Sequence, residues 1–157
     1  MTIREKIDKI LEYAVIIFLS VLVIDVLWQV ISRYVFASPS SFTDELAGFL
    51  LIWVGMLGAA YVHGKQEHLA IDLLLQRSSP ERQRVMIIII NLVILLFAVL
   101  VLVVGGLWLS ITRFQLDVAS SALRLPLGYV YLVLPISGLL MAYYSNEIIR
   151  KNIKKKK

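Results

Sequence analysis

Residues 85–112 read VMIIIINLVILLFAVLVLVVGGLWLSIT, which is 28 consecutive positions without Asp, Glu, Lys or Arg. An α-helix rises ~1.5 Å per residue, so about 20 mostly apolar residues cross the hydrocarbon core of a membrane. Two further uncharged runs, 46–64 and 125–146, have 19 and 22 residues, and 13–32 form a fourth apolar stretch broken only by Asp25. Backbone amides in lipid must be satisfied without water, which favours helices. The sequence therefore predicts an all-α integral membrane protein with four transmembrane helices.

Turn and capping signals set the expected limits of these helices. Pro39 breaks the chain after the first helix, and Ser41 or Thr43 is expected to cap the second. Ser79 before Pro80 predicts the start of the third helix. Pro135 falls inside the fourth apolar run and predicts a kink there, and Pro126 fits the first turn of that helix. The helices are expected at roughly 13–36, 43–63, 80–112 and 123–146, all within one membrane domain, 1–157.

The first residues carry a different pattern. Within 2–12, isoleucines and Leu11 recur on one helical face and charged residues cover the others. This spacing predicts a short N-terminal amphipathic helix in the membrane interface. The alternative interpretation is that these residues extend the first transmembrane helix into water.

Composition excludes several classes of protein. The chain is 59% hydrophobic, with a mean hydropathy of +0.82. It has no cysteine, so disulfides and thiolate metal sites are excluded.

Thirteen of its 16 basic residues lie on one side if both termini are cytoplasmic. The net charge of +5 therefore indicates membrane topology rather than nucleic-acid binding. Loops 37–43 and 113–122 are expected on the outer side. The terminal lysines are expected to lie near lipid headgroups or to act as a solubilising tail.

Polar residues share one face of the first helix. Asp25, Trp28, Gln29, Ser32 and Arg33 follow i, i+3, i+4, i+7, i+8 spacing. A carboxylate at this depth is unfavourable unless protein or water covers it. It could be a proton or cation site, or part of a polar seam packed against another helix. The second interpretation is favoured because no other charged residue lies at the same depth.

The second helix carries small residues instead. Gly48, Ile52, Gly55 and Ala59 fall on one face, with Gly58 adjacent. Small residues let helix backbones approach closely in lipid. The face is therefore predicted to pack against another helix.

Sites for metals, cofactors or catalysis are not predicted. His63 and His68 lie near Glu67 and Asp72 but lack the i, i+4 spacing of a helical metal-binding pair. The sequence contains no phosphate-binding loop and no nucleophile–base motif. A membrane enzyme has almost no support.

One segment carries a family resemblance. Residues 33–72 read RYVFASPSSFTDELAGFLLIWVGMLGAAYVHGKQEHLAID. Matching elements are Arg33-Tyr34, Asp44-Glu45, Trp53, Gly58-Ala59-Ala60, and His68 followed by Asp72. With these elements the chain resembles the small membrane subunit, the Q or DctQ-like subunit, of tripartite ATP-independent periplasmic (TRAP) transporters. Phe42, where the family often has Trp, and Gly48, where a larger or polar residue is common, depart from the pattern.

The resemblance implies a role in the bacterial inner membrane. The small subunit would brace a large subunit, a sodium-coupled elevator, for uptake of an organic anion such as a dicarboxylate or sialic acid delivered by a periplasmic binding protein. The residues expected to contact the large subunit are Asp25, Trp28, Gln29, Arg33, Gly48, Gly55 and Ala59. Those expected to dock the binding protein are Asp44, Glu45, Arg113, Asp117 and Arg124. The alternative is a self-contained, proton-coupled four-helix exporter that uses Asp25.

Overall fold

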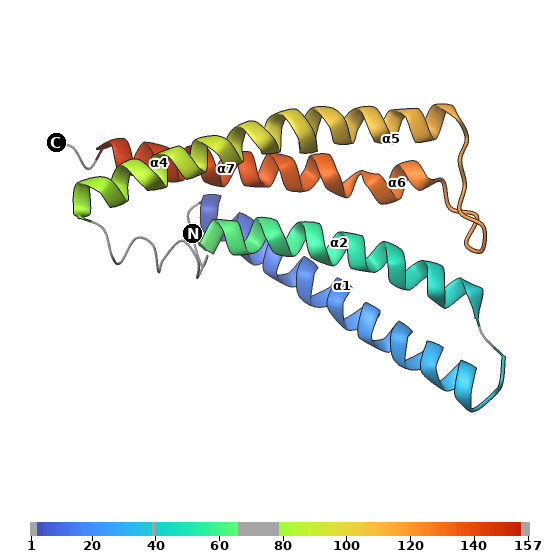
Figure 1. Cartoon of the computed structure of the whole chain (residues 1–157). Helices are drawn as coiled ribbons and strands as arrows, with labels where there is room; N and C mark the ends of the chain where they lie inside the picture. Colours follow the sequence, from blue (N-terminus) through green and yellow to red (C-terminus); the bar gives the residue numbers. More distant parts are fainter. Residues whose placement is uncertain (1–2, 39, 66–78, 155–157) are drawn as a thin grey trace. The chain divides into compact units, whose positions relative to one another are not determined.

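The computed structural model describes residues 3–38, 40–65 and 79–154 and is built from helices in these ranges (Figure 1). The all-α prediction is confirmed. Within these ranges, four helical stretches are long and apolar enough to cross a membrane, in agreement with the four predicted spans. They are Arg4–Tyr34, Ser41–Lys65, Glu81–Gln115 and Leu127–Lys154.

Helix α1 runs without a break over Ile3–Tyr34. Within the described residues, which begin at residue 3, the amphipathic segment is continuous with the membrane span, as the alternative interpretation of an extended first helix expects. Leu11, on the apolar face of the amphipathic segment, is buried. Leu11 therefore packs within the chain, whereas Ile10 of the same apolar set is 69% exposed.

Helix α2, Ser41–Lys65, begins two residues earlier than predicted. Its N-terminal turn is held by Ser40, because the Thr43 N–H donates to Ser40 Oγ at 3.4 Å and the Asp44 N–H to the Ser40 carbonyl at 3.3 Å. The predicted caps, Ser41 and Thr43, are therefore wrong by one and three positions. The Thr43 hydroxyl instead donates to the Ser40 carbonyl, at 3.0 Å.

The third span contains a segment that the sequence did not indicate. Helix α4, Pro80–Phe97, continues into a π-helix, η1, Ala98–Gly105, and then into α5, Gly106–Gln115. The predicted start at Pro80 agrees with the structure. A π-helix closes hydrogen bonds between residues five apart and is rare. Here it leads into two successive glycines, Gly105 and Gly106.

The fourth span is broken near its predicted proline. Helix α6, Leu127–Tyr131, and α7, Val133–Lys154, are separated at Leu132. Pro135 has no N–H, so it cannot donate to the Tyr131 carbonyl four residues earlier. The kink is therefore confirmed. The span begins later than the predicted residue 123, because Pro126 is the N-cap rather than part of the first turn.

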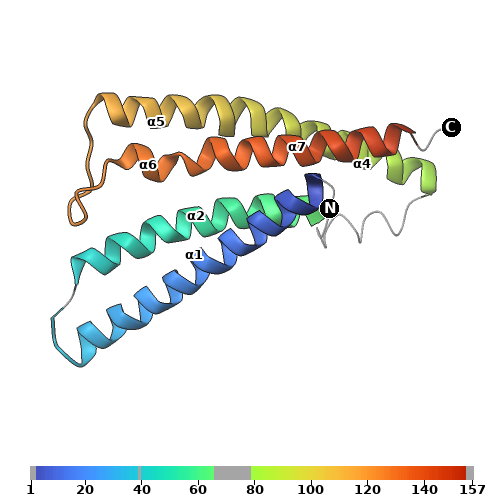
Figure 2. The ribbon, with the colours of Figure 1, turned by 180° about the vertical axis from the view of Figure 1, so that it is seen from behind.

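The chain divides into two compact units, Met1–Gly58 with Trp108–Val133 and Ala59–Leu107 with Leu134–Lys157. The assignment of 1–157 to one membrane domain stays a prediction. In the first unit α1 and α2 lie side by side (Figures 1 and 2), with the rings of Phe18 and Trp53 centred 5.3 Å apart.

Packing in the second unit depends on glycine. A Cβ at Gly138 of α7 would lie 2.7 Å from the Leu102 Cβ and 3.0 Å from the Ala98 carbonyl oxygen of η1. At Gly106 a Cβ would lie 2.9 Å from the Pro135 Cδ. The two spans thus approach each other through positions that admit no side chain.

Candidate functional site

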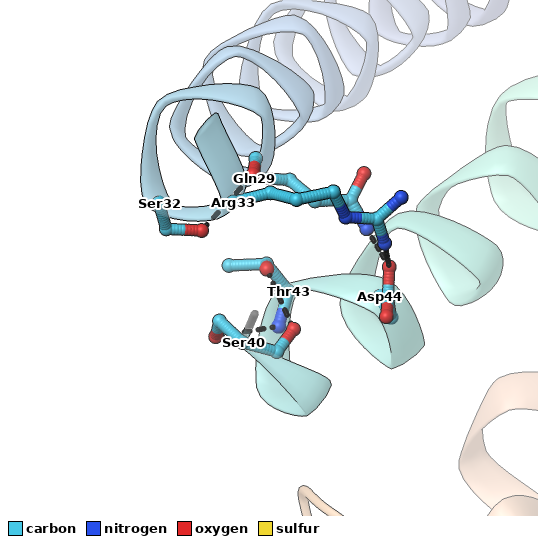
Figure 3. A network of polar contacts seen from close by, with 6 residues as sticks. All are labelled: Gln29, Ser32, Arg33, Ser40, Thr43 and Asp44. Atoms are coloured by element: carbon cyan, nitrogen blue, oxygen red, sulfur yellow. Dashed lines mark hydrogen bonds and ion pairs between the residues drawn. The ribbon is translucent and has the colours of Figure 1, made fainter. Parts of the chain in front are cut away.

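Three residues of the predicted polar face of the first helix, Gln29, Ser32 and Arg33, lie where α1 ends and α2 begins (Figure 3). The Gln29 side-chain amide donates to Asp44, and Arg33 Nη2 lies 3.8 Å from Asp44 Oδ1. The Ser32 hydroxyl donates to the Gln29 carbonyl at 3.0 Å. Arg33 thus pairs with Asp44, the first of the two adjacent acids near the start of α2.

Asp25 lies one helical turn before Gln29 on the same face of α1. Its side chain is 7% exposed, and Oδ2 has no hydrogen-bond partner among the described residues. Trp28, by contrast, is exposed. The assignment of Asp25 and Gln29 to a partner-facing surface is therefore weakened, because Asp25 is covered within the chain and Gln29 is bonded to α2. Their contact with a large subunit stays a prediction.

Glu45, next to Asp44, is bound to another part of the first unit. Oε1 accepts the Ser121 N–H at 2.9 Å, and Oε2 accepts the N–H groups of Ala122 and Leu123 at 2.9 and 2.8 Å. Neighbouring residues on a helix project ~100° apart, since a turn takes about 3.6 residues. The two adjacent acids therefore reach different elements, Asp44 the end of α1 and Glu45 the loop before α6.

That loop is a small hairpin, residues 118–127. Ala119 and Pro126 form an isolated antiparallel bridge. The Ser120 N–H donates to the Leu125 carbonyl at 2.9 Å, and the Leu127 N–H to the Val118 carbonyl at 2.9 Å. The three N–H groups bound by Glu45 sit at the tip, where a hairpin supplies no partner strand. This carboxylate therefore satisfies donors that the 118–127 hairpin cannot satisfy internally.

The chain enters the 118–127 hairpin through a helix-terminating motif. Asp117 has φ 51°, a left-handed conformation. Its N–H donates to the Phe114 carbonyl at 3.2 Å, and the Val118 N–H to the Arg113 carbonyl at 3.2 Å. This pair of bonds is the Schellman pattern that ends helices. Asp117 thus occupies a position where Gly is usual, and Arg124, at φ 53°, adopts the same conformation on the other side of the tip.

Aromatic packing holds α5 against α6 below the 118–127 hairpin. The rings of Phe114 and Tyr129 meet edge to face with centroids 4.9 Å apart. A Cβ at Gly128 would lie 2.6 Å from the Phe114 ring, so glycine is required for this contact. The Arg113 guanidinium lies 6.0 Å from the centre of the Tyr131 ring.

All five predicted docking residues belong to the first unit. Asp117 and Arg124 are exposed and Arg113 is half-buried, whereas Asp44 and Glu45 are engaged within the chain. Their role in docking a binding protein stays a prediction.

The predicted small-residue face of α2 is open. Gly48, Ile52, Gly55 and Ala59 are exposed. A Cβ at Gly48, Gly55 or Gly58 would meet no atom within 4 Å. The glycines of the later spans, such as Gly106, Gly128 and Gly138, are already in close contact within the chain. The α2 face is thus shaped for close approach but is not filled by this chain's own side chains.

Two family-motif positions, His68 and Asp72, lie outside the described residues. The ring of Trp53 packs against that of Phe18 at a tilt of 43°, and Gly58, another motif residue on α2, borders the open face. No group of three or more His, Cys, Asp or Glu side chains able to hold a metal occurs in 3–38, 40–65 and 79–154. Sequence reasoning missed the contact between Glu45 and the 118–127 hairpin, because no spacing rule links positions so far apart.

Comparison with known protein families decides the assignment. Residues 14–154 match the model of the DctQ component of tripartite ATP-independent periplasmic transporters. The chain belongs to this family. It is a multi-pass membrane protein and a small permease subunit of the TRAP class, as the resemblance implied. It is 30% identical over 138 residues to a TRAP transporter small permease protein of Haemophilus influenzae, an alignment that covers 87% of this chain and 83% of the relative.

Two relatives are longer permeases. The sialic acid TRAP transporter permease protein SiaT of Haemophilus influenzae is 46% identical over 56 residues, which are 36% of this chain and 9% of SiaT. The isethionate TRAP transporter permease protein DctMQ of Oleidesulfovibrio alaskensis is 30% identical over 110 residues, which are 68% of this chain and 16% of DctMQ. In both, the matched segment is a small part of a longer protein.

Proposed function

We propose that this chain braces a larger TRAP membrane subunit that carries out sodium-coupled, elevator-type uptake of an organic anion. In this role the chain holds part of the stationary scaffold and binds no substrate itself. A periplasmic binding protein delivers the anion, and the chain's outer loops form part of the surface on which that protein docks.

The longer relatives support a large partner. In SiaT and DctMQ the segment similar to this chain is joined to a much longer remainder. A subunit that is separate here would find the corresponding remainder in another polypeptide. Sialic acid and isethionate, for which those relatives are named, are both organic anions, and this supports the same broad substrate class for the present system.

The open glycine face of α2 is the observation that carries the proposal. At Gly48 and Gly55 this face of α2 carries no side chain, and a Cβ at either position would meet no atom within 4 Å. In a membrane, helices associate through close van der Waals packing, and small residues let two helix backbones approach each other. A neighbouring helix is therefore favoured over lipid at this face. We therefore assign this face, with the exposed Trp28 on α1, to the contact with the large subunit.

The membrane location and orientation follow from charge. Thirteen of 16 basic residues fall in the two terminal regions and in residues 65–84, which run from the last residue of α2 to the first turns of α4. The positive-inside rule places those parts in the cytoplasm. The end of α1, the beginning of α2 and the 118–127 hairpin then face the periplasm of a bacterial inner membrane, where a binding protein reaches them.

Reconstitution tests the proposal directly. The large subunit and binding protein are placed in liposomes with and without this chain, and uptake of the organic anion is followed under an inward sodium gradient. Uptake that depends on the chain supports the scaffold role. Undiminished uptake without it, or proton-coupled transport by the chain alone, would refute that role.

A further inference from the structure

Both oxygens of the Glu45 carboxylate accept hydrogen bonds from within the chain. The donors are backbone N–H groups of the 118–127 hairpin, at 2.8 to 2.9 Å. A carboxylate engaged by three donors has little capacity left for cations of another protein. Glu45 was predicted to contact the binding protein directly, and its geometry fits a different task.

We infer that Glu45 is a positioning residue that fixes the 118–127 hairpin in the conformation that docks the binding protein. This inference rests on the proposed function, because it needs the hairpin to be part of the docking surface. Glu45 acts through the hairpin, and the exposed side chains assigned to the partner contact are Arg124, directly after its tip, and Asp117, which directly precedes its first residue.

The local geometry explains why an acid at this position can hold the hairpin. Glu45 lies in the second turn of α2, which begins at Ser41. Side chains on a helix lean toward its N-terminus, so Glu45 projects toward the end from which the helix starts. Three successive backbone N–H groups at the hairpin tip form a concave donor site of the kind that binds anions. The glutamate occupies that site from within the same chain.

The hairpin needs such an anchor because its own contacts are few. One isolated bridge and a small set of backbone bonds connect its two sides. Arg124 within the hairpin, and Asp117 directly before it, have left-handed backbone conformations that are unfavourable for side chains with a Cβ. Two-stranded hairpins are at best marginally stable alone in water. Without the carboxylate, the hairpin would sample other conformations and display Asp117 and Arg124 in the docking geometry for only part of the time.

The test compares Glu45→Gln with Asp44→Asn, the adjacent acid that binds α1 instead. Backbone exchange over 118–127 is measured by hydrogen–deuterium exchange mass spectrometry on the complete transporter, and uptake is titrated with binding protein. Glu45→Gln should speed exchange across the hairpin, and Asp44→Asn should leave it unchanged. The binding-protein concentration for half-maximal uptake should rise ~3- to 10-fold in Glu45→Gln at an unchanged maximal rate, because a surface populated part of the time binds more weakly by that fraction.

Three outcomes overturn the inference. One is unchanged exchange in Glu45→Gln. A second is faster exchange with an unchanged half-maximal concentration, which leaves the scaffold role standing. The third is a fall in maximal rate alone, which points to a purely structural effect. If Glu45→Gln does not assemble, Glu45→Asp serves instead: it keeps the charge on a shorter side chain and should show both effects at smaller size. Uptake that needs no small subunit defeats the proposed function itself, a result that the reconstitution without this chain detects separately.

Discussion

His63 Nε2 and Ser145 Oγ lie 2.8 Å apart in a buried hydrogen bond that joins α2 to α7 within the second unit. His63 is 2% exposed and Ser145 is fully buried. Beside this bond, a Cβ at Gly64 would lie 2.8 Å from the Tyr144 ring, so the two helices are in close contact here. His63 had been considered only as a poor metal ligand. Its place in the structure gives it a role in helix association instead.

Ser145→Ala should destabilise the chain by about 0.6 kcal/mol, the average measured for hydrogen bonds between membrane helices, and by at most ~1.7 kcal/mol, the largest measured value. Ser137→Ala is the matched control, because Ser137 is also fully buried on α7 but donates only to Leu134 in its own helix, at 2.9 Å. The measurement is reversible unfolding in mixed micelles. Equal losses in the two variants would mean that the bond to His63 contributes nothing specific.

Two glycine substitutions should distinguish a glycine that contacts the large subunit from a glycine that the chain needs for its own packing. Gly55→Leu adds volume where a Cβ meets nothing within 4 Å, so the chain should remain as stable as the wild type. Gly138→Leu forces atoms against Leu102 and the Ala98 carbonyl and should destabilise the chain by ~1–3 kcal/mol or more.

Co-purification with the large subunit provides the second measurement on this pair. Gly55→Leu should reduce recovery of the complex while the isolated chain melts normally. Normal recovery with Gly55→Leu would remove the α2 face from the proposed interface.

The four spans could be predicted because a membrane helix is specified by its own composition. Long uncharged runs and prolines are local signals, and Pro80 and Pro135 act in the structure as the sequence indicates. The limits were less certain, since Ser40, Ser41 and Thr43 can all cap a helix and the choice depends on how the chain leaves α1.

The features that escaped prediction depend on contacts between distant residues. The π-helix η1 has the same apolar composition as the helix around it, and it packs against Gly138. The 118–127 hairpin contains one isolated bridge, and three of its backbone N–H groups are bound by the distant Glu45. Asp44 and Glu45 are adjacent and chemically alike. Only the positions of α1 and of the 118–127 hairpin decide that Asp44 bonds to α1 and Glu45 to the hairpin.

Reversing the charge of Arg33 or of Asp44 alone should lower the free energy of unfolding, and exchanging the two charges should restore it. Both side chains are about half exposed, 52% and 51%, so the pair contributes only ~0–1 kcal/mol. Arg33→Glu alone places two acids together, and Asp44→Arg alone places two cations together. The double exchange restores attraction, and the Gln29 amide can present its oxygen to the new arginine. A double-mutant cycle on unfolding free energy measures the coupling, and additive effects would show that the 3.8 Å contact is not energetically significant.

Reporter fusions should place both termini in the cytoplasm. The expectation rests on the distribution of basic residues, of which 13 of 16 lie on the predicted inner side. Fusions after residues 75 and 157 should be active with a cytoplasmic reporter, and fusions after 40 and 118 with a periplasmic one. A periplasmic signal at 75 or 157 would invert the topology and move the 118–127 hairpin away from any periplasmic partner.

Asp25→Asn should preserve transport by the assembled complex. Asp25 is covered within the chain, and its one buried oxygen without a partner among the described residues does not by itself make an ion pathway. The asparagine amide has the same shape as the carboxyl group, can still form hydrogen bonds and carries no charge, so a packing role tolerates the change. Uptake should therefore keep its wild-type rate and pH profile across a pH series. A self-contained proton-coupled exporter predicts the opposite result, since a residue that cannot titrate cannot carry protons. Loss of uptake in Asp25→Asn at full assembly, together with proton flux through liposomes that contain the wild-type chain alone, would favour the exporter over the scaffold.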